Sequence, residues 1–407
     1  MAGIREYRRD KQKKESTGKK NQEEKGREDY DKKLRAHKLK NYGIMAVMAV
    51  FVVVLIVVIA VINHVNSYSD YTVENSARRT DSGYAVYLSD ESGYIKCSRD
   101  GAAAFSFGGT QKWNKTYEIN SLEVDECGKY FAVAGIGGSD IYIFNRDGYV
   151  STVNTALPIV KISVSEQGLV VAILEDKDAD YINMYDKDGN KIYTIKTTAE
   201  SDGIPTDISV SPDGKKLAVA FTSVKGLDLS TSVVFYNFDE VGQNENERIV
   251  GGFDSYNNQL VGEVQFLNGT TVVAAAENII SFYMVKEYPK LVKNIEITDK
   301  IEQIFYSDTN FAYVYIDEEN NKRVLCVYDT AGEKIFAKEV SESYTSFCFT
   351  EDGIMMYGGT KFMLINKKGK ELISDEFETE ISRILQAGDN KEYVFITLDK
   401  LYKIKFK

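Results

Sequence analysis

Short apolar runs alternate with polar turns from about residue 81 to the end of the 407-residue chain. Within 159–165 (IVKISVS), valine or isoleucine occupies every even position, and Lys161 and Ser163 lie between them, so one face of an extended strand is apolar. Other runs, such as 217–221 (LAVAF), are apolar on both faces, as strands that are covered on both sides must be. These lengths and periods predict β-strands throughout this part of the chain.

A four-residue turn signal recurs between neighbouring apolar runs and defines a repeat. Each instance ends in Gly or Asn, the residue types that tolerate positive φ in a hairpin. The mean spacing is roughly 42 residues, which is the size of one four-stranded propeller blade. The eight instances are 90–93 (DESG), 125–128 (DECG), 165–168 (SEQG), 211–214 (SPDG), 266–269 (FLNG), 307–310 (SDTN), 350–353 (TEDG) and 387–390 (AGDN).

These repeats predict an all-β fold, a β-propeller over residues 81–407 with eight blades, or seven if one weak repeat is not a blade. The last repeat, 381–407, supplies only three strands. An unpaired outer edge invites aggregation, so we expect 71–75 (YTVEN) to supply the missing strand and close the ring. The fourth repeat is the longest, and its segments 223–232 and 239–257 are predicted to be enlarged loops that form the main contact region.

One much longer apolar run precedes the repeats. Residues 43–62 (GIMAVMAVFVVVLIVVIAVI) contain no charge, and a helix of about 20 residues spans the roughly 30 Å hydrocarbon layer of a bilayer. We therefore predict a transmembrane α-helix over 42–63, followed by a juxtamembrane linker over 64–80. A buried soluble helix and a cleaved signal peptide are the alternatives. The 40 polar residues that precede the run favour an uncleaved signal anchor.

The charge distribution orients this predicted span. The chain carries a net charge of -11, but residues 1–40 hold 15 basic and 8 acidic residues, so that segment carries +7 and the remainder −18. The positive-inside rule then places the N-terminus in the cytoplasm and the propeller outside the cell membrane. The tail, 1–41, has too few apolar residues to bury a core and is predicted to be disordered.

Candidate chemistry is scarce in the repeat region. The only two histidines, His37 and His64, precede it, which excludes Ser-His-Asp, Cys-His and His-ligated metal sites there. The D-x-D-x-D run 176–180 lacks the Gly and Glu of a calcium-binding loop, so a solvated hairpin tip is favoured. We expect no catalytic, cofactor-binding or metal-ligating residues, and no cofactor. A hydrolase that uses two carboxylates is the remaining enzymatic alternative.

Cysteines and glycosylation motifs leave smaller questions open. On the predicted outer side, an even number of cysteines permits disulfides, but buried free thiols are the alternative. These cysteines are Cys97, Cys127, Cys326 and Cys348. Asn114 and Asn268 begin N-x-T motifs, which we expect to remain unmodified.

The turn 185–190 (YDKDGN) resembles the turns that close hairpins in quinoprotein-like and WD40-like propellers. The whole layout of charged tail, single span and outer propeller resembles single-pass membrane-anchored propeller proteins of Gram-positive, clostridia-type bacteria. These proteins are grouped as a domain of unknown function, and the resemblance covers about residues 40–407. Trp113 is the only tryptophan, and the GH and WD pairs of WD40 repeats are absent, so quinone binding is not expected.

These features together predict a non-enzymatic protein-interaction scaffold at the cell surface. The alternative is an extracytoplasmic sensor of a small ligand or a wall glycan. The expected partners are the lipid bilayer, through the single span, and proteins of the cell envelope. The acidic outer part disfavours nucleic acid.

Overall fold

The structure, a computed structural model, describes residues 48, 50–54, 68–79, 84–225, 228–388 and 391–407. The chain divides into two compact units, 1–67 and 68–407. In the first unit, residues 48 and 50–54 are helical, and their side chains are exposed. The predicted tail and most of the predicted span lie outside the described residues, and no described helix has the length and hydropathy needed to cross a membrane.

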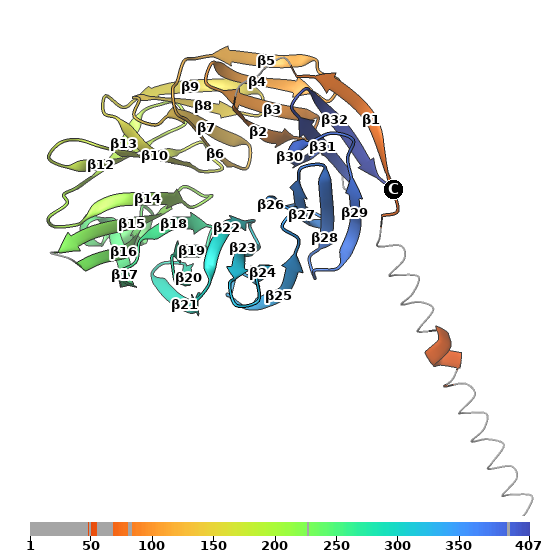
Figure 1. Cartoon of the computed structure of the whole chain (residues 1–407). Coiled ribbons are helices and arrows are strands. Elements are labelled where there is room, and N and C mark those ends of the chain that lie inside the picture. Colours follow the sequence, from red (N-terminus) through yellow and green to blue (C-terminus); the bar gives the residue numbers. More distant parts are fainter. Residues whose placement is uncertain (1–47, 49, 55–67, 80–83, 226–227, 389–390) are drawn as a thin grey trace, which may run out of the picture. The chain divides into compact units, whose positions relative to one another are not determined.

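The second unit is a β-propeller of eight four-stranded antiparallel sheets, arranged in a ring (Figure 1). In each blade the first strand is innermost, and the following strands lie successively further out. Blade 1 contains β2 (Ala85–Asp90), β3 (Gly93–Ser98), β4 (Gly101–Ser106) and β5 (Gln111–Thr116). Blade 2 contains β6 (Leu122–Cys127), β7 (Tyr130–Gly135), β8 (Asp140–Asn145) and β9 (Gly148–Asn154). Blade 3 contains β10 (Ile159–Val164), β11 (Val170–Leu174), β12 (Asp180–Tyr185) and β13 (Lys191–Thr197). Blade 4 contains β14 (Ile204–Val210), β15 (Lys216–Lys225), β16 (Asp228–Asn237) and β17 (Ile249–Asn257).

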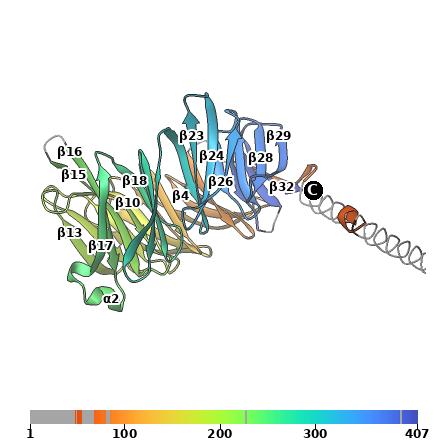
Figure 2. The ribbon, with the colours of Figure 1, turned by 90° about the horizontal axis from the view of Figure 1, so that it is seen from below.

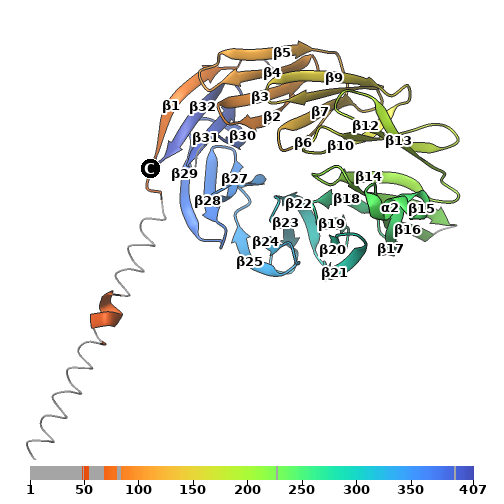
Figure 3. The ribbon, with the colours of Figure 1, turned by 180° about the vertical axis from the view of Figure 1, so that it is seen from behind.

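The remaining blades continue the ring in chain order (Figure 3). Blade 5 contains β18 (Val261–Phe266), β19 (Thr271–Ala276), β20 (Ile279–Val285) and β21 (Pro289–Glu296). Blade 6 contains β22 (Lys300–Tyr306), β23 (Asn310–Asp317), β24 (Lys322–Asp329) and β25 (Lys334–Val340). Blade 7 contains β26 (Ser346–Phe349), β27 (Gly353–Gly358), β28 (Lys361–Asn366) and β29 (Glu371–Glu376). Blade 8 contains β30 (Ile381–Gln386), β31 (Glu392–Thr397), β32 (Lys400–Phe406) and β1 (Tyr71–Arg78).

Blade 8 closes the ring by joining the two ends of the propeller. Strand β1 pairs with β32 in an antiparallel register that runs from Tyr71↔Phe406 to Arg78↔Lys400. Lys403 on β32 forms ion pairs with Glu74 on β1 at 3.0 Å and with Glu392 on β31 at 2.7 Å, so an ion pair also holds β1 against β32. The predicted count of eight blades and the predicted closing strand are both confirmed. The strand is longer than predicted and reaches Arg78.

The second strand of each blade supplies much of the core. Strands β7, β11, β19 and β27 are buried along their whole length, because neighbouring blades cover both of their faces. Ala132 and Ala134 are fully buried between blades 2 and 3, where small side chains allow close approach. Phe131 stacks on Phe144 at a centroid distance of 4.9 Å within the cluster that joins blades 1 and 2.

The repeated turn ends in glycine for two different reasons. Gly128, Gly168 and Gly214 adopt positive φ of 57–80°, as the turn signal predicted. Gly93 does not, but a Cβ atom there would collide with the carbonyl oxygen of Phe105 on the neighbouring strand. Backbone clearance therefore selects glycine in the first blade.

The two long segments of the fourth repeat are not the single contact region that we predicted. Within segment 223–232, residues 223–225 and 228–232 are strand rather than loop, because β15 and β16 pair out to Lys225↔Asp228. Segment 239–257 contains the short helix α2 (Glu240–Gln243), a 3-10 turn and strand β17. The tip of the β15–β16 hairpin and α2 lie at opposite ends of β16, so they belong to opposite faces of the ring (Figure 2).

We name these faces by their connections. The turn face carries the turns between first and second strands and the connections between third and fourth strands, including α2. The opposite face carries the turns between second and third strands and the connections between blades. The sequence left open whether the four cysteines form disulfides. All four are free in the structure, and Cys97 and Cys326 are buried in the core.

Candidate functional site

The polypeptide enters the propeller on its turn face. Tyr68 donates its backbone N–H to the carbonyl of Leu372 at 2.7 Å, and its ring lies 5.5 Å from that of Phe406. Burial raises the pKa of Tyr68 to about 12, and the nearby carboxylate of Asp352 adds to the shift. Asp352 lies in the β26–β27 turn and also accepts a hydrogen bond from the Tyr393 hydroxyl at 2.9 Å. The first described residues of the propeller are thus fastened to a turn of blade 7.

A large recess opens on the same face. Its volume is about 1250 Å³, and turns from blades 1, 2, 6, 7 and 8 supply most of its wall. The lining from blades 1 and 2 includes Ser89, Asp90, Glu91, Ser92, Lys112, Trp113, Gly128, Lys129, Arg146 and Asp147. The lining from blades 6 to 8 includes Ser307, Asp308, Thr309, Asn310, Phe349, Thr350, Glu351, Lys367, Gln386 and Gly388. Both charge signs are present on both sides.

Internal contacts hold the wall of this recess in place. Lys112 pairs with Asp90 at 2.7 Å, and Arg146 pairs with Glu126 at 2.9 Å. The Trp113 indole donates to the Arg146 carbonyl at 3.1 Å, and its ring stacks 5.8 Å from Phe144. Because the wall residues belong to turns anchored on rigid strands, the recess is a preformed surface.

Two donors on this wall lack partners among the described residues. They are Nη1 of Arg146 and Nε2 of Gln386, whose other amide atom, Oε1, accepts the Glu351 N–H at 2.7 Å. An unpaired shielded donor costs about 1–3 kcal/mol. Both nitrogens are shielded from the surface, so they are a local cost of the packing of the wall.

A second polar feature lies on the innermost strands of blades 2 to 6. We call it the polar hub, and it consists of Glu123, Asp125, Lys161, Asp207, Glu263 and Tyr306. Lys161 is 3.5 Å from both Glu123 and Asp207. Asp125 accepts the N–H of Val164 in blade 3 at 2.6 Å, and Asp207 accepts the N–H of Val264 in blade 5 at 2.7 Å. The hub carboxylates therefore join blade 2 to blade 3, blade 3 to blade 4, and blade 4 to blade 5.

Burial changes the acidity of the hub. Burial raises the pKa of Asp125 to about 7, although the Val164 N–H and Lys161 oppose the shift. Burial also raises the pKa values of Glu123, Asp207 and Glu263. Burial lowers the pKa of Lys161, but Asp207 and Glu123 outweigh it, so the net pKa is raised. Four carboxyl groups share one ammonium group, so the hub takes up protons more readily than exposed carboxylates do.

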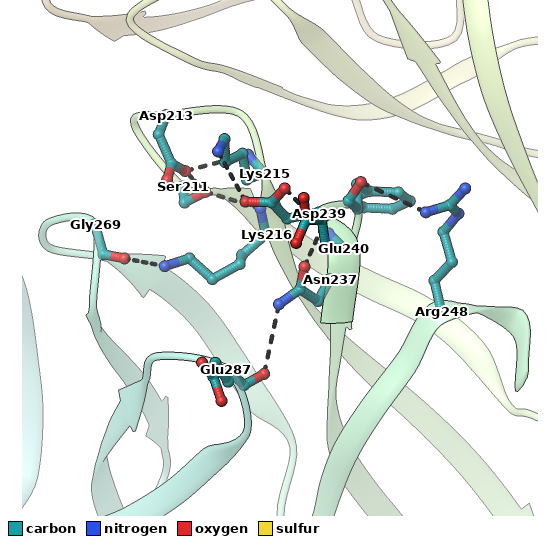
Figure 4. Close-up of polar contacts among 11 residues, drawn as sticks. Ser211, Asp213, Lys215, Lys216, Asn237, Asp239, Glu240, Arg248, Gly269 and Glu287 are labelled. Atoms are coloured by element: carbon teal, nitrogen blue, oxygen red, sulfur yellow. Dashed lines mark hydrogen bonds and ion pairs between the residues drawn. The ribbon is translucent and has the colours of Figure 1, made fainter. Parts of the chain in front are cut away.

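Polar contacts on the turn face also join blade 4 to blade 5 (Figure 4). Lys216 is buried, and its ammonium group donates to the carbonyl oxygens of Gly269 and of Val285. Lys215 pairs with Asp239 at 2.8 Å beside α2. The ammonium groups of Lys215 and Lys216 bind neighbouring protein groups, so we assign both residues a structural role.

The other residues singled out from the sequence do not form a site. Asp176, Asp178 and Asp180 lie at the β11–β12 connection on the opposite face. The described part of the chain contains no group of three or more His, Cys, Asp or Glu residues arranged to hold a metal ion. Both histidines lie outside the described residues.

Sequence reasoning missed the recess and the hub. The turn signal placed many of the recess residues in turns, but it did not show which of these turns would line the same recess. The hub had a weaker signal, since charged residues interrupt the apolar pattern on the first strands of repeats 2 to 5.

Solved structures with a similar architecture include a eukaryotic initiation factor, with 11% identity, a TM-score of 0.51, and coverage of 84% of this chain and 87% of that one. Raptor of Chaetomium thermophilum matches at 11% identity and TM-score 0.46, over 84% of this chain and 29% of that one. The WD40 domain of Neurospora crassa Pan2 matches at 8% identity and TM-score 0.43, over 83% and 97%. Identities this low show the fold alone.

No curated protein matches the sequence. A family model does match, and it extends over residues 63–406, which includes every blade. The predicted membership of a propeller family without an assigned function is confirmed. The chain belongs to DUF5711, a family of unknown function.

Proposed function

We propose that this protein is a non-enzymatic scaffold, anchored in the membrane of a Gram-positive cell, that binds envelope proteins through the recess on its turn face. The observation that carries the proposal is the recess itself, a preformed hollow of about 1250 Å³ with a mixed-charge wall. Small-molecule pockets are mostly apolar and measure about 300–1,000 Å³. A larger hollow with both polar and apolar lining, built from several turns, fits a polypeptide segment better.

Membrane anchoring is the second part of the proposal. The uncharged run 43–62 and the basic tail before it support a span with the propeller outside. Within the first unit, the described helical residues Met48 and Phe51 are 60% and 67% exposed. Apolar side chains this exposed on a helix suit a lipid environment better than water.

One observation favours a sensor as a second candidate function. Glu351, which lines the recess, is the direct neighbour of Asp352, which contacts Tyr68 at the point where the chain enters the propeller. A ligand in the recess would therefore press on the same turn that holds the entering chain. This arrangement offers a route from an outer ligand, such as a wall glycan, to the preceding segment.

Crosslinking from the recess should capture specific partners. A photoreactive residue at Glu91 or Lys367, on the full chain in its native envelope, is expected to yield the same protein adducts from both positions. Ile192 is the control position, because it is 52% exposed on the outer strand β13. Adding Lys129→Glu should lower the adduct yield several-fold by changing the charge of the wall. Equal adducts from Ile192 would contradict the proposal.

Wall fragments separate the two candidate functions. A rise of several degrees in the melting temperature with muropeptides, lost in Lys129→Glu, would favour the sensor. Protein adducts without such stabilisation would favour the scaffold.

Thiol labelling on intact cells tests the orientation. Ile192→Cys, on the propeller surface, is expected to react with a membrane-impermeant maleimide before lysis. Ser16→Cys, in the tail, should react only after lysis, because the proposed topology places it inside. Chains without the introduced cysteines supply the background from the native thiols. The reverse pattern, or equal labelling at both sites, would rule out the proposed orientation.

A further inference from the structure

The β15–β16 hairpin extends beyond its neighbours on the opposite face. Strand β14 begins at Ile204, whose partner on β15 is Thr222, so residues 223–225 have no partner on that side. The hairpin pairing itself continues to Lys225↔Asp228. Figure 2 shows the end of this hairpin on the side away from α2. A two-stranded extension of this kind presents side chains that no neighbouring strand covers.

One face of this extension is apolar. Directly opposed residues of antiparallel strands share a face, and the pairs Ile204↔Thr222 and Val224↔Leu229 place three large apolar side chains together. The Asn258 N–H donates to the Leu229 carbonyl at 2.7 Å, and the Thr231 hydroxyl donates to the Gln259 carbonyl at 2.8 Å, so the segment that leads to Leu260 runs along the face that Thr231 shares with Leu229. We call Ile204, Val224, Leu229 and Leu260 the apolar ledge.

Three of the four side chains of the ledge are largely exposed. Ile204, Val224 and Leu260 are 51%, 68% and 48% exposed. Single exposed apolar residues are normal on a protein surface, but adjacent ones commonly mark an interaction site.

Carboxylates lie in the segments that lead to the ledge. Glu200 and Asp202 belong to the connection that precedes Ile204. Glu277 precedes Asn278, whose N–H donates to the Gln259 side chain at 3.1 Å, next to Leu260. Glu200, Asp202 and Glu277 are exposed. In these segments the sequence contains one basic residue, Lys225. The rim is therefore acidic and complements a basic partner.

We propose that the apolar ledge docks a partner-protein segment with a large apolar side chain flanked by Lys or Arg. The apolar residue packs against Val224 and Leu260, and the flanking cations face the acidic rim. The proposal rests on the scaffold function, but it concerns the face opposite the recess. The protein would then hold two partners at once, one on each face.

Peptide binding tests the ledge directly. The probe is a synthetic peptide of alternating Leu and Lys, titrated by fluorescence anisotropy onto the full chain in detergent. Val224→Asp and Leu260→Asp are expected to weaken binding at least tenfold. Ile192→Asp is the matched control, because Ile192 is 52% exposed on β13, and it should leave binding unchanged. A peptide of alternating Leu and Glu should bind at least tenfold more weakly.

Several outcomes would overturn the ledge proposal. Unchanged binding of the Leu-Lys peptide in both Val224→Asp and Leu260→Asp is one of them. Equal binding of the Leu-Glu and Leu-Lys peptides is another. The third is that the Leu-Lys peptide does not bind, while the chain self-associates and Val224→Asp abolishes this self-association. The last result would assign the ledge to a second copy of this chain. Val224→Thr keeps the β-branched shape, so it should fold and still weaken binding if Val224→Asp does not fold. Lys129→Glu in the recess should not affect the peptide, so failure of the recess proposal remains distinguishable.

Discussion

Removal of Tyr71–Arg78 is expected to lower the melting temperature of the propeller by roughly 10 °C or more, as measured by circular dichroism on the full chain. The deletion leaves β32 as an open edge and removes the ladder that runs from Tyr71↔Phe406 to Arg78↔Lys400. Each net hydrogen bond contributes about 1 kcal/mol. Lys403 also loses Glu74, and Phe362 loses the ring of Tyr71, 5.8 Å away.

An open edge has a second consequence, which light scattering can follow. Unpaired strand edges template association with other chains, so the deleted protein should aggregate at concentrations where the intact chain does not. Deletion of residues 6–13, a segment of equal length in the tail, is the control and should change neither property. An unchanged melting curve after removal of Tyr71–Arg78 would show that β32 does not need the closing strand.

The closing strand illustrates what the sequence can predict. The turn signal recurs at nearly constant spacing, and the last repeat supplies three strands where the others supply four. Because the last repeat lacks a fourth strand, the strand-like segment 71–75, which belongs to no repeat, is predicted to fill that position. The structure confirms this, since β1 pairs with β32. Blade number and closure follow from counting, because each blade is one local supersecondary unit.

The fourth repeat illustrates what the sequence alone does not predict. Segment 223–232 is rich in Ser, Thr and Leu with a Gly near its centre, a composition that suits a loop as well as a solvated hairpin. Only the pairing of β15 with β16 distinguishes the two. The assignment of α2 and the hairpin tip to opposite faces follows from the direction of β16, which composition does not reveal.

The polar hub was harder to predict from the sequence than the structure of the fourth repeat. Glu123 and Glu263 are 140 residues apart, and strand alternation indicates only that each side chain leaves the apolar face. Their convergence depends on the rotation from one blade to the next, which no local pattern encodes. A charged residue on the first strand of several consecutive repeats is the one signal that points to it.

The free energy of unfolding is expected to rise as the pH falls from about 8 to about 5, because the hub binds protons more tightly in the folded chain. Burial raises the pKa of Asp125 from 3.8 to about 7. Between these values the folded chain holds a proton that the unfolded chain has released, so stability decreases as pH rises through this window. One pKa unit is worth about 1.4 kcal/mol, which predicts a change of about 2–4 kcal/mol.

Urea unfolding of the full chain at pH 5, 6, 7 and 8 measures this change. Asp125→Asn should remove most of it, because the amide oxygen still accepts the Val164 N–H while the group no longer titrates. Glu392, whose pKa is lowered by Lys403 and Lys405, acts in the opposite sense only below about pH 4.5. Asp178→Asn, on the exposed β11–β12 connection, controls for the general loss of negative charge. Equal pH dependence in Asp125→Asn and the parent chain would mean that Asp125 stays ionised over this range, and that its joint between blades 2 and 3 does not respond to protons.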